Sequence, residues 1–146
     1  MSKPYILLVE DNPDDVELTR RAFAKNHIAN EVVVLNDGAA ACEFLFGDRG
    51  GRGYPQIILL DLKLPKISGL EVLEQIRANH GTQLIPTVIL TSSKQEEDLL
   101  EGYRLGVNSY VRKPVDFNEF VEAVRQVGLY WLVLNEGPPS GLRGGM

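Results

Sequence analysis

Five short apolar runs alternate along this chain with segments of helical period, and this alternation constrains the fold more than any other feature. The runs occupy residues 6–9, 32–35, 57–60, 88–90 and 107–111. The segments between and after them predict helices over 13–26, 38–46, 70–79, 94–105 and 117–128. Strands that alternate with helices form a parallel sheet with right-handed crossovers and helices on both faces. The sequence therefore predicts an α/β domain with a doubly wound, five-stranded parallel sheet of (βα)5 topology.

The composition fits one soluble domain and argues against several kinds of partner. A chain of 146 residues has the size of one domain, and its net charge of −5 argues against nucleic acid, whose binding needs clustered Lys and Arg. No run approaches the roughly 20 apolar residues of a spanning helix, which argues against a membrane. Cys42 is the single cysteine, and its apolar setting predicts a small buried hydrophobe. With no intrachain disulfide available, we expect a cytoplasmic protein. The Gly-rich residues 47–55 predict a flexible loop.

Polar residues suited to phosphoryl chemistry stand at or just after the ends of the predicted strands. In chain order, these residues are Glu10, Asp11, Asp61, Thr91 and Lys113. The carboxyl ends of parallel strands lie along one edge of a sheet, where ligands bind, so we expect these side chains to converge. Together they could hold a divalent cation and accept a phosphoryl group. Each acid alone could equally be a turn or a helix cap.

Four motifs resemble the motif set of receiver domains, the phosphorylatable modules of two-component response regulators. They are Val9-Glu10-Asp11, Leu60-Asp61-Leu62-Lys63-Leu64-Pro65, Leu90-Thr91-Ser92 and Tyr110-Val111-Arg112-Lys113-Pro114. The resemblance spans residues 5–129 and implies a flavodoxin-like fold with strand order 2-1-3-4-5. It predicts a receiver domain over residues 1–130 and an extension over 131–146. The apolar part of that extension either packs on its own domain or contributes to a dimer or partner surface.

The resemblance implies a role for each matching acid. Asp61 is the expected phosphoacceptor, which takes a phosphoryl group from a phosphohistidine of a sensor histidine kinase. Glu10 and Asp11 are expected to hold Mg²⁺ together with Asp61 and the backbone carbonyl of Lys63. Glu10 stands where Asp is commoner in the family, so its longer side chain could act through a metal-bound water. The chain is then a regulator that assists its own phosphorylation, and not a turnover enzyme.

The remaining matches concern the response to phosphorylation. Thr91 and Lys113 are expected to contact the phosphoryl group, and Lys113–Pro114 resembles the family's cis peptide, which aims the lysine. Tyr110 resembles the family's switch aromatic. It is expected to move together with Thr91 in a two-state population shift.

Within the family, the chain is most similar to single-domain regulators of bacterial phytochrome histidine kinases. The shared features are the acidic first loop, the Gly/Arg loop before the third strand, the segment after Asp61 and the apolar extension. This similarity implies a bacteriophytochrome as the kinase partner. It also implies a homodimer.

Two other classes of protein use similar parts. A phosphatase of the haloacid dehalogenase type also uses an Asp nucleophile and Mg²⁺, but it places a second Asp where this chain has Lys63. A flavodoxin-like electron carrier needs a hydroxyl- and glycine-rich first loop, and Glu10 and Asp11 would repel a flavin phosphate. The sequence therefore favours a signalling module over both.

Overall fold

Five parallel strands form the sheet in the computed structural model, which describes residues 4–91, 104, 109–112 and 117–128. The strands are β1 (Tyr5–Val9), β2 (Glu31–Leu35), β3 (Ile57–Leu60), β4 (Thr87–Thr91) and β5 (Ser109–Arg112). Their order is β2-β1-β3-β4-β5, and every neighbouring pair is parallel. The predicted doubly wound sheet with strand order 2-1-3-4-5 is confirmed.

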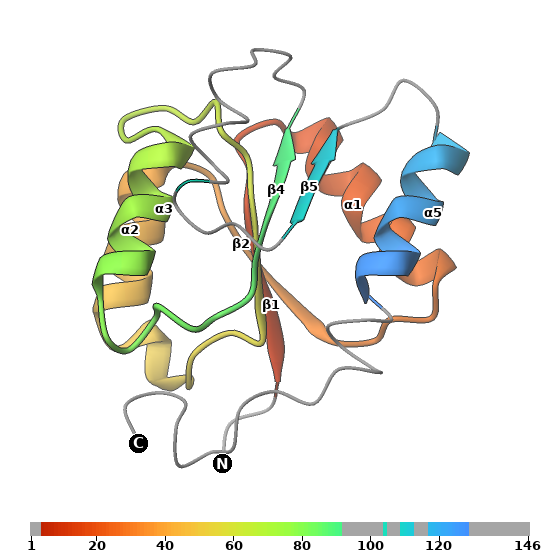
Figure 1. Cartoon of the computed structure of the whole chain (residues 1–146). Coiled ribbons are helices and arrows are strands. Elements are labelled where there is room, and N and C mark those ends of the chain that lie inside the picture. The colour runs from red at the N-terminus through yellow and green to blue at the C-terminus, as the bar shows by residue number, and fades with distance from the viewer. Residues whose placement is uncertain (1–3, 92–103, 105–108, 113–116, 129–146) are drawn as a thin grey trace.

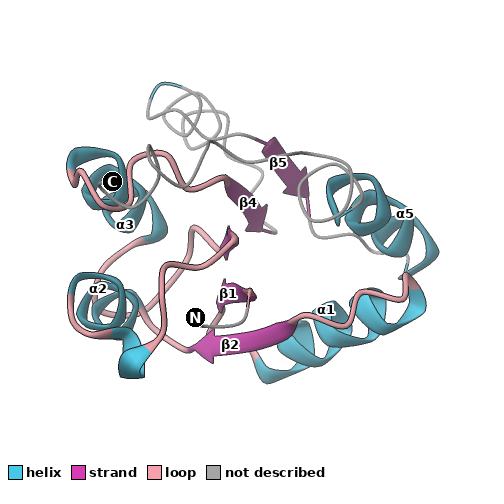
Figure 2. Ribbon diagram, turned by 90° about the horizontal axis from the view of Figure 1, so that it is seen from below, coloured by secondary structure: helices cyan, strands magenta, loops and turns pink. Residues whose placement is uncertain are grey.

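Helices cover both faces of this sheet. α2 (Gly38–Phe46) and α3 (Gly69–Ala78) lie on one face, and α1 (Pro13–Lys25) and α5 (Phe117–Gly128) lie on the other (Figure 1, Figure 2). A short 3-10 helix, η1 (Arg49–Gly51), follows α2. The helix predicted over 94–105 lies outside the described residues except for Arg104, which is helical. Within the described ranges, no helix is both long and apolar enough to cross a membrane.

The core has two halves, one on each face of the sheet. Because helices cover both faces, β1 and β3 are buried along their whole length and are almost entirely apolar. Alternate residues of β1 divide between the halves. Leu7 and Val9 pack with α2 and α3, whereas Ile6 and Leu8 pack with α1 and α5. The packed core therefore fixes the positions of the residues that follow these two strands.

α1 and α5 are joined by a polar bridge as well as by apolar packing. Ala22 and Phe23 of α1 and Phe120 and Val124 of α5 are buried. Asn26 caps the end of α1, and its Nδ2 donates to the carbonyl of Ala22 at 2.9 Å and to that of Val121 at 3.0 Å. One side chain thus satisfies backbone carbonyls on both helices and fixes their relative position.

The Gly-rich segment before β3, predicted as a flexible loop, contains the short helix η1, and its side chains attach it to the rest of the domain. The Arg49 guanidinium lies 3.9 Å from the centroid of the Tyr54 ring. Arg52 Nη2 forms an ion pair with Glu31 Oε2, at the start of β2, with a separation of 3.0 Å. The prediction of flexibility rested on the glycines alone and did not anticipate these arginine contacts.

Candidate functional site

The candidate site lies where β1 and β3 end side by side. Val9 pairs with Leu60 in the sheet, and the N–H of Asp61 donates to the carbonyl of Val9 at 3.1 Å. Glu10 and Asp61, the next residue along each strand, therefore leave the sheet together. Glu10, Asp11 and Asp61 each offer a carboxylate oxygen, and these oxygens all lie within 4.8 Å of one another. The three acids meet at the carboxyl edge of the sheet, as the strand ends predict.

Two of these three carboxylates are buried. Glu10 is 1% exposed and Asp61 6% exposed, whereas Asp11 faces solvent. The N–H of Asn12 donates to Glu10 Oε2 at 3.2 Å, and the N–H of Lys63 donates to Asp61 Oδ1 at 3.3 Å. Two unit charges at the 4.8 Å limit repel by about 3.5 kcal/mol at an effective dielectric constant of about 20. A divalent cation would offset this repulsion, and carboxylate oxygens are its preferred ligands.

The backbone around Asp61 lies directly against the start of α3. The N–H of Gly69 donates to the carbonyl of Leu62 at 2.9 Å. A Cβ atom at position 69 would lie 2.1 Å from the carbonyl oxygen of Asp61, so only glycine allows this approach. Ser68 caps the helix and accepts from the N–H of Glu71 at 3.3 Å. The sequence predicted a helix from residue 70, one residue after its observed start, but not the contact of that start with Asp61.

The turn between β2 and α2 also touches the site. We call its residues, Asn36–Gly38, the β2–α2 corner. Asn36 Nδ2 donates to the backbone carbonyl of Glu10 at 3.0 Å. Asp37 accepts from the N–H of Ala40 at 2.7 Å and forms a 3.4 Å ion pair with Lys66. The hydrogen bond from Ala40 and the nearby Lys66 lower the pKa of the Asp37 carboxyl. Nothing near Asn36 and Asp37 in the sequence indicates this link to the acids.

The other predicted site residues follow β4 and β5. Thr91 is the last residue of β4, so its backbone lies at the same edge of the sheet as Asp61, and Tyr110 lies in β5 opposite Ile89. Lys113 and Pro114 lie outside the described residues, as do the side chains of Thr91 and Tyr110. Their phosphoryl contacts, the aromatic switch and the cis peptide therefore stay predictions.

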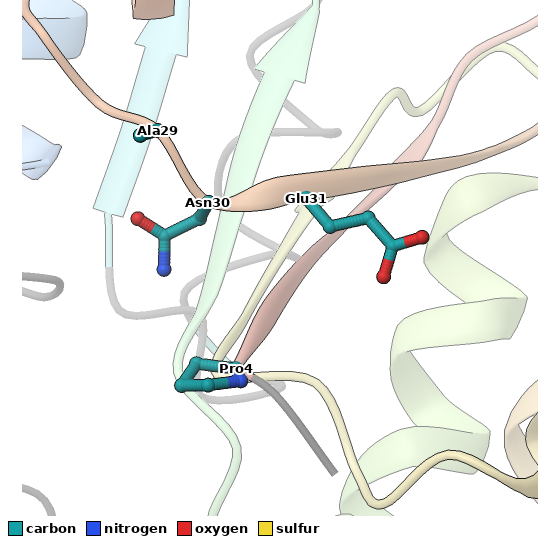
Figure 3. Close-up of a pocket in the computed structure, with 4 residues that line it drawn as sticks. All are labelled: Pro4, Ala29, Asn30 and Glu31. Carbon is teal, nitrogen blue, oxygen red and sulfur yellow. The ribbon is translucent and has the colours of Figure 1, made fainter.

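A hollow elsewhere on the surface is separate from the acids. It has a volume of about 470 Å³ and is lined by Pro4, Ala29, Asn30 and Glu31 (Figure 3). Pro4 directly precedes β1 and Glu31 opens β2, so this hollow lies at the amino ends of the strands. The acids lie at the carboxyl ends, and the hollow therefore forms no part of their site.

A doubly wound parallel sheet with clustered acids at its carboxyl edge defines a class of α/β protein with a candidate cation site at that edge. Comparison with known proteins narrows the class. The model of the response regulator receiver domain matches residues 6–125. The chain belongs to this family.

Two curated relatives span most of this chain and most of their own length. The probable methanogenesis regulatory protein FilR2 of Methanothrix harundinacea is 42% identical over 91% of this chain and 86% of its own. Response regulator Rcp1 of Synechocystis sp. is 39% identical over 87% of this chain and 88% of its own.

Solved structures agree with this assignment. The bacteriophytochrome response regulator RtBRR is 52% identical, with a TM-score of 0.74 over 95% of this chain and 86% of that one. The phosphorylated cyanobacterial phytochrome response regulator RcpA is 35% identical, with a TM-score of 0.86 over 95% of this chain and 100% of that one. The Mn²⁺-bound form of Rcp1 is 37% identical, with a TM-score of 0.84 over 93% of this chain and 99% of that one.

Membership of this family defines the general function. The chain is a response regulator of two-component signalling, related to phytochrome response regulators, and its partner is a histidine kinase. The phosphatase and electron-carrier alternatives are not favoured. The acidic cluster and the Mn²⁺-bound relative together indicate a site for a divalent cation.

Proposed function

We propose that Asp61 is the residue that accepts a phosphoryl group from the phosphohistidine of a sensor kinase. The observation that carries the proposal is the cluster of Glu10, Asp11 and Asp61, with carboxylate oxygens within 4.8 Å of one another at the carboxyl edge of the sheet. A carboxylate oxygen of Asp61 bonds to phosphorus while the P–N bond breaks. The other ring nitrogen of the phosphohistidine carries a proton, so the imidazole keeps the electron pair of the broken bond and leaves as neutral histidine, and Asp61 becomes an acyl phosphate.

Mg²⁺ is the proposed cofactor. Glu10, Asp11, Asp61 and the backbone carbonyl of Lys63 would hold it, since Mg²⁺ takes carboxylate and carbonyl oxygens. When bound, this cation supplies positive charge that offsets the negative charge of the acids and of the incoming phosphoryl group. The Mn²⁺-bound form of the relative Rcp1 supports a divalent ion as the cofactor.

The residues around Asp61 orient it before the reaction. The hydrogen bond from the N–H of Lys63 fixes one carboxylate oxygen, and the close approach of Gly69 fixes the backbone behind it. Asp61 is 6% exposed, so bulk water reaches little of the side chain. Phosphoryl transfer depends mostly on position and electrostatics, and a fixed acceptor suits it.

The response to phosphorylation is assigned to the end of β4 and to β5. Thr91 and Lys113 would contact the phosphoryl group, and a cis Lys113–Pro114 bond would aim the lysine. Tyr110 would change position as Thr91 moves, which shifts the protein between two conformations. The family motifs support these roles.

The partner proposed within the kinase class is a bacteriophytochrome. The likeness to RtBRR and to phytochrome response regulators supports it. We further propose a homodimer in the cytoplasm that acts by protein contact and is not a turnover enzyme. The receiver domain would occupy residues 1–130, which contain the matched residues 6–125, and residues 131–146 would form an extension.

Intact-mass measurement after incubation with acetyl phosphate and Mg²⁺ tests the proposal. We expect the wild type to gain one phosphoryl group and Asp61→Asn to gain none. Asp48→Asn is the matched control because Asp48 is exposed and caps η1, away from the acids. No adduct on the wild type, or an adduct on Asp61→Asn, would contradict the proposal. Release of many phosphates per chain from phosphate esters would favour the phosphatase instead.

A further inference from the structure

The β2–α2 corner holds the backbone on which Glu10 stands. β2 pairs with β1 so that Leu35 lies opposite Val9, and the N–H of Glu10 donates to the carbonyl of Leu35 at 2.9 Å. Asn36 then donates from its side chain to the carbonyl of Glu10 at 3.0 Å. The backbone N–H and carbonyl of Glu10 are therefore both hydrogen-bonded to residues at the end of β2. The hydrogen bond to the carbonyl depends on the side chain of Asn36 alone.

The same corner holds the loop that follows Asp61. The N–H of Gly38 donates to the carbonyl of Pro65 at 3.3 Å, and Asp37 pairs with Lys66 at 3.4 Å. Lys66 has a φ of +69°, so the loop is bent sharply at the point of contact. A Cβ at Gly38 would lie 1.9 Å from the carbonyl oxygen of Ile67. A larger residue at position 38 would therefore push the loop away from α2.

We infer that the β2–α2 corner is a positioning element of the cation site. Asn36 sets the place of Glu10, and Gly38 sets the loop that carries Lys63 and follows Asp61. Glu10 follows β1, whereas Asp61 and Lys63 follow β3, and the corner contacts the backbone that follows each of these strands. The inference rests on the proposed function, because it assigns the acids to a bound cation. Residues that orient metal ligands without touching the metal commonly change its affinity.

A titration of the full chain with Mn²⁺ tests this inference without an activity assay. Binding is measured as the loss of the electron paramagnetic resonance signal of the free ion. The variants are Asn36→Ala and Gly38→Ala, and the matched control is Gly47→Ala. Gly47 follows the other end of α2, where a Cβ would lie 2.6 Å from the carbonyl oxygen of Glu43. The control therefore introduces the same kind of clash away from the acids. Thermal unfolding of each variant reports its stability separately.

We expect Asn36→Ala and Gly38→Ala to weaken Mn²⁺ binding by about tenfold or more. Gly47→Ala should bind as the wild type does, even with a lower Tm. Folded variants at positions 36 and 38 with wild-type affinity would overturn the inference, and so would equal weakening in the control. If Gly38→Ala does not fold, Asn36→Ala decides, since Asn36 is exposed and its loss leaves the core unchanged. A wild type that binds no Mn²⁺ would instead refute the proposed cation site itself.

Discussion

Replacing Gly69 with alanine tests the geometry on which the position of Asp61 depends. In the structure, a Cβ at this position would lie 2.1 Å from the carbonyl oxygen of Asp61 and 2.6 Å from Cα of Leu62. Cβ atoms essentially never approach other heavy atoms closer than 3.0 Å. Both neighbours are backbone atoms and cannot rotate away. The start of α3 and the end of β3 must therefore separate.

Two effects of opposite sign decide the change in stability. Overpacking against a fixed neighbour costs about 1–3 kcal/mol. Alanine is favoured over glycine within a helix by about 1 kcal/mol, and Gly69 is the first residue of α3, where the full gain is not expected. We therefore expect Gly69→Ala to lower the free energy of unfolding by about 1–2 kcal/mol.

Urea unfolding followed by circular dichroism measures this difference. Gln75→Ala is the control, because Gln75 is exposed on the same helix and its loss should change stability by less than about 0.5 kcal/mol. A Gly69→Ala variant as stable as the wild type, or more stable, would refute the close approach of α3 to Asp61. The same variant should also gain less phosphoryl group from acetyl phosphate in a fixed time, since the Asp61 backbone has moved.

Three further predictions concern groups outside the acidic cluster. Asn26→Ala removes the bridge between α1 and α5 and should cost about 1–2 kcal/mol in urea unfolding, whereas an unchanged midpoint would contradict the bridge. The pKa of the Asp37 carboxyl is lowered in the folded state. Its carboxylate therefore stabilises the fold at pH values above its ordinary pKa of 3.8, and this stabilisation is lost as the pH falls below that value. The urea midpoints of the wild type and Asp37→Ala should therefore converge in acid, and a constant gap would count against this. Burial raises the pKa of the Cys42 thiol, so a thiol reagent at neutral pH should label the native chain much more slowly than the urea-unfolded chain; equal rates would contradict that burial.

The sheet could be predicted from the sequence because its strands are apolar and alternate with helical segments. The ends of those strands then located Glu10, Asp11 and Asp61, since parallel strands bring their carboxyl ends to one edge. The observed cluster has the acids where that rule places them. The start of α1 at Pro13 was predicted correctly, and Asn12 caps it, whereas α3 starts at Gly69, one residue before the predicted start.

The contacts of the β2–α2 corner could not be predicted from the sequence. Asn36 and Asp37 have the composition of an ordinary turn, and nothing near them in the chain indicates a bond to Glu10. That bond depends on the register between β1 and β2, which the alternation of apolar runs does not define. The contact of Gly38 with Ile67 likewise joins two loops that are distant in sequence.

Borohydride trapping identifies the phosphorylated residue directly. Borohydride reduces an acyl phosphate of aspartate to homoserine, and peptide mass mapping then identifies the position. After incubation with acetyl phosphate and Mg²⁺, we expect homoserine at position 61 and reduction at no other acid of the cluster. Reduction at Asp11 or Glu10 instead, or no reduction in a chain that carries a phosphoryl group, would contradict it.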